Sequence, residues 1–221
     1  MKRSTSKIKA FLLTVVFSLV FASGILAQDK NEYKQAMSAA LSQMSTIKDN
    51  TAYLELANQF QRIAENEATE WLPAYYATLN TTLYAFGEKD KTKVDPLLDQ
   101  AQKMIDKALK IKATESEIWI LQGMLYQARI MVDPMTRGQK YFMQANEAFD
   151  KAESLNAENP RIYYLRGQSM MNMPKMFGGG KEAAKPLFQK ASEKFLSFKP
   201  AEMFAPNWGK EANAQLLKSC E

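Results

Sequence analysis

Apolar side chains recur every three or four residues along most of the chain, with polar and charged residues between them. This spacing places the apolar residues on one face of a helix. Together with residues that commonly start and end helices, it predicts helices over residues 30–46, 51–66, 70–86, 95–112, 115–132, 135–156, 160–173 and 181–197, and a last helix over 207–218. No stretch has the pattern of a strand, so the predicted fold class is all-α.

Three dipeptides mark expected helix starts. Asp95-Pro96, Asp133-Pro134 and Asn159-Pro160 each join a side chain that accepts hydrogen bonds to a proline. The acceptor can satisfy a free N–H at a helix N-terminus, and a proline in the first turn loses no hydrogen bond. We therefore expect a helix to begin at each of these positions.

Pairs of alanines repeat along the chain at a fixed interval. The two members of a pair are seven residues apart, which puts both on one face of a helix after about two turns. The pairs are Ala57 and Ala64, Ala101 and Ala108, Ala145 and Ala152, and Ala184 and Ala191, and the first three pairs are 44 residues apart. The chain is therefore built from repeats, whose helices pack closely through these small side chains.

Two glycines lie inside predicted helices, Gly123 and Gly167. A glycine in a helix costs roughly 0.5–1 kcal/mol relative to alanine, so we expect a neighbouring helix to press against the bare backbone there. We infer that Gly123 packs against Ala145. By the same reasoning Gly167 packs against Ala184.

These residues resemble the tetratricopeptide repeat family, in which each helix pair carries an aromatic, a glycine, a tyrosine, an alanine, a second aromatic and a second alanine. The third repeat aligns Trp119, Gly123, Tyr126, Ala145, Phe149 and Ala152 with that pattern. The spacing of 44 residues exceeds the family's usual length of about 34, and Ala113 and Ala157 stand where the family has proline. The chain therefore looks like a secreted bacterial type with extended repeats.

The resemblance implies a right-handed α-solenoid of about four helix-turn-helix repeats with a C-terminal capping helix. The expected repeats are 30–66, 70–112, 115–156 and 160–197, and the expected cap is 205–219. The cap would cover the apolar face that the last repeat otherwise exposes.

The first 27 residues have the composition of a secretory signal peptide. Four basic residues among the first nine precede an apolar run over 10–22, and small residues follow. This pattern predicts cleavage before Gln28, or as an alternative after Gly24. The domain would then be 28–221, in the periplasm or outside the cell, with no membrane span. The other alternative is an uncleaved inner-membrane anchor over 8–27, which is long enough to span a bilayer.

Charge and composition exclude several functions. Removing the four basic residues of the signal lowers the formal net charge from +5 to +1, so the chain is not predicted to bind nucleic acid. The chain has no histidine, which removes the usual general base and the common zinc sites. We therefore expect no enzymatic activity, no catalytic residue, no metal site and no cofactor.

Cys220 is the single cysteine, so it can form a disulfide only with another chain, as in a homo-oligomer.

In tetratricopeptide solenoids the first helix of each pair lines a concave groove. The resemblance therefore implies a groove lined by Tyr76, Asn80, Tyr84, Ile120, Met124, Gln127, Arg161, Tyr164, Gln168 and Met171. Aromatics, amides and methionines suit an adaptable peptide-binding surface. The alternative is that some of these residues pack against the C-terminal segment. The predicted function is an exported, non-enzymatic scaffold that binds a protein or peptide partner through this groove.

Two other functions stay open. One is a periplasmic carrier of a small ligand or of copper(I), because soft thioether ligands select that ion. Met170, Met171, Met173 and Met176 supply such a cluster in the sequence. The other is a structural envelope protein that associates with itself.

The exported protein is predicted to lack residues 1–27, because a charged start followed by a short apolar run is the pattern that signal peptidase removes. The intact mass of protein purified from its native cell envelope checks this. A mass that includes Met1 would indicate the anchor, and the protein would then sediment with membranes.

Overall fold

The computed structural model describes residues 31–221, and this part of the chain is helical without any strand. A helix covers residues 31–44. It is followed by α2 (Asn50–Asn66), α3 (Leu72–Gly87), α4 (Lys91–Ile111), α5 (Ser116–Ile130), α6 (Pro134–Leu155), α7 (Pro160–Asn172), the short 3-10 helix η1 (Lys175–Phe177), α8 (Lys181–Ser197) and α9 (Lys210–Ser219). The predicted signal peptide, 1–27, and the alternative anchor, 8–27, fall outside the described residues. Within 31–221, no helix is both long and apolar enough to cross a membrane.

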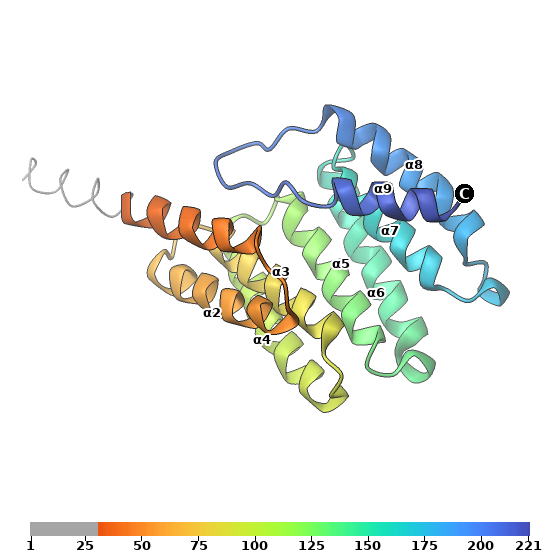
Figure 1. Cartoon of the computed structure of the whole chain (residues 1–221), viewed down its shortest axis with the longest axis horizontal. Helices are drawn as coiled ribbons and strands as arrows, with labels where there is room; N and C mark the ends of the chain where they lie inside the picture. Colours follow the sequence, from red (N-terminus) through yellow and green to blue (C-terminus); the bar gives the residue numbers. More distant parts are fainter. Residues whose placement is uncertain (1–30) are drawn as a thin grey trace, which may run out of the picture.

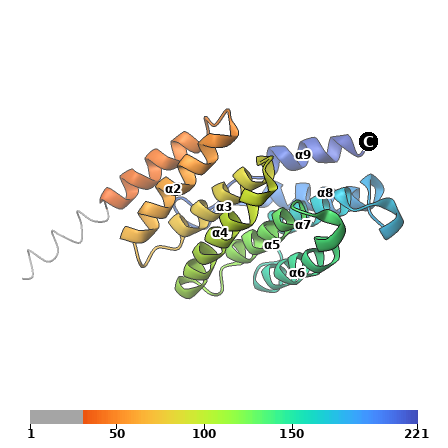
Figure 2. The same cartoon turned by 90° about the horizontal axis from the view of Figure 1, so that it is seen from below.

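Antiparallel helix pairs stack side by side into a short solenoid (Figures 1 and 2). The inner layer contains α3, α5 and α7, which contact one another in that order. The partner helices α4, α6 and α8 form the outer layer, and helix 31–44 with α2 makes the first pair. The predicted all-α solenoid is confirmed.

The repeated alanines lie where the helices pack. Ala101, Ala145 and Ala184 are buried, as are their partners seven residues further on. The last helix, α9, packs against α8. Asn213 on α9 is buried there and donates hydrogen bonds from Nδ2 to the Phe188 carbonyl oxygen (3.0 Å) and to Ser192 Oγ (2.7 Å).

The expected start of α4 at Asp95 is wrong. The helix begins at Lys91, because the Asp90 side chain accepts from the Thr92 N–H (3.1 Å) and caps the N-terminus. Pro96 therefore lies inside α4, where it removes one backbone hydrogen bond. The Asp95 carboxylate instead pairs with Arg129 and Arg137. The starts at Asp133 and Asn159 are confirmed, since both side chains accept backbone N–H groups.

The expected partners of the two glycines are also wrong. A Cβ atom at Gly123 would clash with the ring of Phe149, and one at Gly167 would clash with the ring of Phe188. Both rings are fully buried. The glycines therefore make room for large aromatic rings rather than for the alanines, because a flat ring needs more space against a helix than a methyl group does.

Gly123→Ala is expected to destabilise the fold by roughly 1–3 kcal/mol, since the added methyl group overpacks the contact with Phe149. Gly138→Ala is the matched control. Gly138 also lies inside a helix, but nothing stands within 4 Å of the added atom, so alanine there should stabilise by about 0.5–1 kcal/mol. Urea denaturation measures both. Equal midpoints for the two variants would contradict the packing described here.

Candidate functional site

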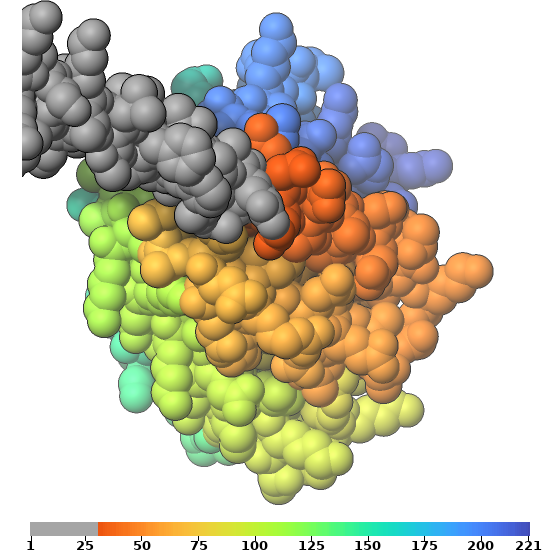
Figure 3. Space-filling view, turned by 90° about the vertical axis from the view of Figure 1, so that its left-hand side faces the viewer, coloured from red at the N-terminus to blue at the C-terminus, as the bar shows by residue number. Residues whose placement is uncertain are grey.

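The segment between α8 and α9, residues 198–209, crosses the inner face of the solenoid (Figure 1). We call it the strap. It reaches the N-terminal end of the molecule, where the Phe204 ring meets the Tyr33 ring edge to face at 6.1 Å. Figure 3 shows the C-terminal part of the chain beside helix 31–44 at this end. The strap therefore covers a face that the sequence predicts to be open.

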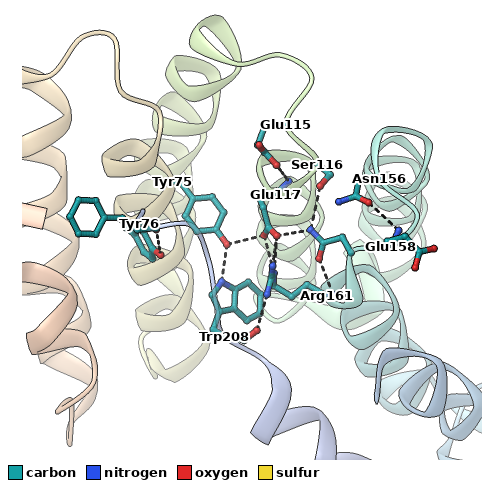
Figure 4. Close-up of polar contacts among 11 residues, drawn as sticks. Tyr75, Tyr76, Glu115, Ser116, Glu117, Asn156, Glu158, Arg161 and Trp208 are labelled. Atoms are coloured by element: carbon teal, nitrogen blue, oxygen red, sulfur yellow. Dashed lines mark hydrogen bonds and ion pairs between the residues drawn. The ribbon is translucent and has the colours of Figure 1, made fainter. Parts of the chain in front are cut away.

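A buried ion pair lies beneath the strap (Figure 4). Glu117 stands in the first turn of α5, where the helix dipole favours a carboxylate. Arg161 stands in the first turn of α7 and is completely buried. Its Nε donates to both carboxylate oxygens of Glu117, at 3.0 and 2.9 Å, and its Nη2 also pairs with Glu117. The pair joins two neighbouring repeats.

Further donors complete the coordination of the carboxylate. Asn159 Nδ2 donates to Glu117 Oε1 (2.5 Å), and Tyr75 Oη donates to Glu117 Oε2 (3.3 Å). Asn159 also caps α7, since its Oδ1 accepts from the Arg161 N–H (3.1 Å). A buried charge is stable only when such hydrogen bonds replace water.

The strap supplies the remaining partners through Trp208. Its Nε1 donates to Tyr75 Oη (2.8 Å), and its carbonyl oxygen accepts from Arg161 Nη1 (3.1 Å). The guanidinium also lies over the ring of Phe198, 4.4 Å from the centroid, and over that of Trp208, at 5.5 Å. The ion pair thus binds both the backbone and the side chain of the strap.

The far end of the strap is held by α3 and α4. Tyr76 Oη donates to the Phe204 carbonyl oxygen (2.8 Å). Glu202 accepts from Trp71 Nε1 (3.2 Å) and from Lys112 Nζ (3.0 Å). Phe204 adopts a φ of +64°, a left-handed conformation that is rare for a bulky residue. These contacts hold the turn in place.

Burial keeps the phenols of this network neutral. It raises the pKa of Tyr75 well above the usual value, and the nearby Glu117 charge raises it further. Burial raises the pKa of Tyr76 as well, and the Glu117 charge contributes a smaller increase. Burial raises the pKa of Tyr164 to about 12. Each phenol is therefore neutral at physiological pH, so Tyr75 and Tyr76 can donate to Glu117 and to the Phe204 carbonyl oxygen.

The structure separates the ten predicted groove residues into two sets. Six are buried: Tyr76, Asn80, Ile120, Met124, Arg161 and Tyr164. Four are half-buried: Tyr84, Gln127, Gln168 and Met171. The expectation of one open groove is corrected, because the strap occupies its first half. Whether any of these residues binds a partner stays a prediction.

The buried set has structural partners within the chain. Tyr76 and Arg161 bind the strap, and the Tyr164 ring meets the Trp208 ring at 6.3 Å. This is the packing role that the sequence left open as an alternative. Asn80 Nδ2 donates to the Tyr76 carbonyl oxygen in its own helix (2.8 Å).

The half-buried set lies on the C-terminal halves of α3, α5 and α7, while the strap contacts described above lie near the N-terminal ends of these helices. Gln127 Nε2 donates to the Leu165 carbonyl oxygen (2.8 Å) and to Ser169 Oγ (2.7 Å), and so links α5 to α7. Leu83 is half-buried beside Tyr84. We call Leu83, Tyr84, Gln127, Gln168 and Met171 the open half of the inner face.

Two hollows accompany this arrangement. A cleft of about 500 Å³ lies between helix 31–44 and the end of α2, lined by Glu32, Tyr33, Ala36, Ile63, Asn66 and Glu67. A pocket of about 90 Å³ lies under the strap, between Trp71, Glu117 and Phe198.

Of the methionines considered for copper(I), Met176 is exposed on η1 and Met171 is half-buried on α7. The copper site stays a prediction.

Sequence reasoning missed Glu117, Tyr75 and Trp208. One signal was present, since Glu117 and Arg161 are 44 residues apart and so occupy equivalent positions in successive repeats. Opposite charges at equivalent positions of a repeat can meet across the stack. Trp208 was placed in the predicted helix 207–218, which is wrong at its start, because α9 begins only at Lys210 after Gly209 in a left-handed conformation.

The described residues thus form an all-helical solenoid whose inner face is partly covered by its own C-terminal segment. The sequence matches no protein-family model and no curated protein. Among solved structures it is similar to the HusA haemophore from Porphyromonas gingivalis, with a TM-score of 0.77 and 33% identity over 86% of this chain and 92% of that chain. The chain belongs to the same family as HusA. The tetratricopeptide resemblance is not tested by this match and stays a prediction.

Glu117→Gln is expected to destabilise the fold by roughly 3–5 kcal/mol, because it leaves the buried Arg161 without a counter-charge. Glu158→Gln is the control, since the neighbouring Glu158 is exposed and pairs with Lys194 at the surface, where a pair contributes about 0–1 kcal/mol. The free energy of unfolding in urea measures both. If Glu117→Gln lowers the free energy of unfolding only slightly, the ion pair does not hold the strap region together.

Proposed function

We propose that this protein is an exported carrier of haem. The observation that carries the proposal is its membership of the same family as HusA, which is a haemophore. The predicted signal peptide supports export, to the periplasm or the cell exterior. This function corresponds to the ligand-carrier alternative of the sequence analysis, and it favours that alternative over a peptide scaffold.

The open half of the inner face is the proposed haem surface. It combines two apolar side chains, Leu83 and Met171, with the Tyr84 ring and two amides, and it has no charged member. A porphyrin ring is flat and largely apolar, so it suits a surface of apolar and aromatic side chains with a few polar groups.

Iron coordination follows different rules in a chain without histidine. The axial ligands left to such a protein are thioether, thiolate and phenolate groups. Tyr84 donates to Glu88 Oε2 (2.5 Å). This hydrogen bond is the main reason that the pKa of the Tyr84 phenol is raised, and burial adds to it. Tyr84 is thereby a poor phenolate ligand. Met171 is the proposed axial ligand, and contact with the porphyrin ring supplies most of the affinity.

Titration of the exported protein with haem is expected to give a saturable one-to-one complex with a shifted Soret band. Met171→Glu should weaken binding at least tenfold, which corresponds to about 1.4 kcal/mol, because it places a carboxylate against an apolar, anionic ligand. Met143→Glu is the matched control, since Met143 is exposed on the outer helix α6. Absence of saturable binding would refute the proposed function. Equal binding by both variants would refute only the proposed surface.

A second candidate, binding of a protein or peptide, rests on a separate observation. The inner face already holds an extended segment of its own chain through Trp71, Tyr76 and Arg161. A partner segment could use the open half in the same manner. A protein partner captured from the cell envelope, whose binding is lost in Met171→Glu and is not displaced by haem, would support this candidate.

A further inference from the structure

The turns that join the two helices of each pair lie along one edge of the solenoid. In Figures 1 and 2 the turns from α3 to α4, α5 to α6 and α7 to α8 follow one another in a row. We call residues 86–93, 131–140 and 174–185 the turn row. It lies at the opposite ends of the inner helices from the strap contacts.

Large apolar side chains concentrate in this row. Of the eight exposed large hydrophobic residues in the described part of the chain, five lie here: Phe86, Met131, Met135, Met176 and Phe177. Three of them, Phe86, Met131 and Met176, lie at or just beyond the C-terminal ends of the inner helices α3, α5 and α7. Such a concentration on a monomer surface marks an interaction site more often than chance exposure does.

The last turn presents its apolar side chains at a tip. Met176 is 83% exposed and Phe177 is 67% exposed. The turn is closed by backbone hydrogen bonds from the Gly178 N–H to the Lys175 carbonyl oxygen (2.9 Å) and from the Gly180 N–H to the Met170 carbonyl oxygen (2.8 Å). Gly178 and Gly180 have positive φ angles of 85° and 107°, which glycine adopts readily. The turn therefore holds both side chains outward.

The row is also basic. Seven lysines lie in it, Lys89, Lys91, Lys93, Lys140, Lys175, Lys181 and Lys185, against four carboxylates, Glu88, Asp90, Asp133 and Glu182. Asp90 and Asp133 are turned toward backbone N–H groups as helix caps, and Glu88 accepts from the Asp90 N–H (2.8 Å). Six of the lysines are exposed, all but Lys185. Of these, Lys93 pairs with Asp90, Lys175 pairs with Glu182, and Lys181 donates to the Ser219 carbonyl oxygen. Since the formal charge of 28–221 is only +1, this positive surface is local.

We propose that the turn row docks on an anionic lipid surface. Met176 and Phe177 enter the boundary between headgroups and acyl chains, and the lysines pair with lipid phosphates. Exposed aromatic and aliphatic side chains next to lysines are the combination that interfacial membrane binding uses. A protein partner would call for pockets that receive its anchors, whereas these side chains protrude from turns, which suits a deformable surface. The proposal does not depend on the haem-carrier function.

Flotation of the exported protein with vesicles tests the proposal. Binding is expected to vesicles of equal parts phosphatidylcholine and phosphatidylglycerol, and at least tenfold less to phosphatidylcholine alone. Added salt should weaken it, because salt screens the lysine–phosphate attraction. The double variant Met176→Ser, Phe177→Ser should lose at least tenfold in binding.

Leu196→Ser is the matched control, since Leu196 is 81% exposed near the end of α8 and lies outside the row. It should bind vesicles like the parent, and all variants should keep the parent's circular dichroism. Equal binding to both lipid compositions, or parental binding by the double variant, would overturn the proposal. The proposal would also be overturned if the protein does not bind vesicles and instead binds an envelope protein, or associates with itself, through Met176 and Phe177.

Discussion

The buried pairing of Glu117 with Arg161 is the interaction on which the arrangement of the inner face depends. Removing two charges from water is unfavourable unless each finds several hydrogen-bond partners. Asn159, Tyr75 and the Trp208 carbonyl supply those partners. One of them comes from the strap, so the strap completes the coordination of a charge that lies in the core of the stack. Its position is therefore coupled to the packing of α5 against α7.

This coupling divides the inner face into two regions with different roles. Near the N-terminal ends of α3, α5 and α7, aromatic and charged side chains are buried in contacts within the chain. Toward the C-terminal ends, Tyr84, Gln168 and Met171 keep part of their surface accessible. The strap limits the exposed area.

The repeat architecture also separates surfaces by function. Inner helices present residues toward the strap and the proposed ligand, while the turns between paired helices form an edge of their own. Because each repeat places its turn in an equivalent position, similar residues at these turns add up to one continuous surface. Phe86, Met131 and Met176 combine in this way. Ligand binding and surface docking would then involve different parts of the same stack.

Sequence alone determined most of the helical framework. The limits of α8 were predicted as observed, and α2 and α7 within one residue, because amphipathic periodicity and capping residues are local signals. The alanine pairs correctly indicated the buried faces. Of the ten predicted groove residues, six are buried and four, Tyr84 among them, are half-buried, and the groove as a binding surface stays a prediction.

Tertiary structure decided the rest, because those features join residues that no local pattern relates. Gly123 faces Phe149 instead of Ala145, since helical spacing says which face is buried but not which side chain fills the space. The sequence placed Trp208 in a helix over 207–218, and no local pattern related it to Tyr75, 133 positions earlier in the chain, which it contacts in the structure. Only the stacked helices bring Glu117 and Arg161 together, and their need for hydrogen-bond partners in a buried site is one of the contacts that place the strap.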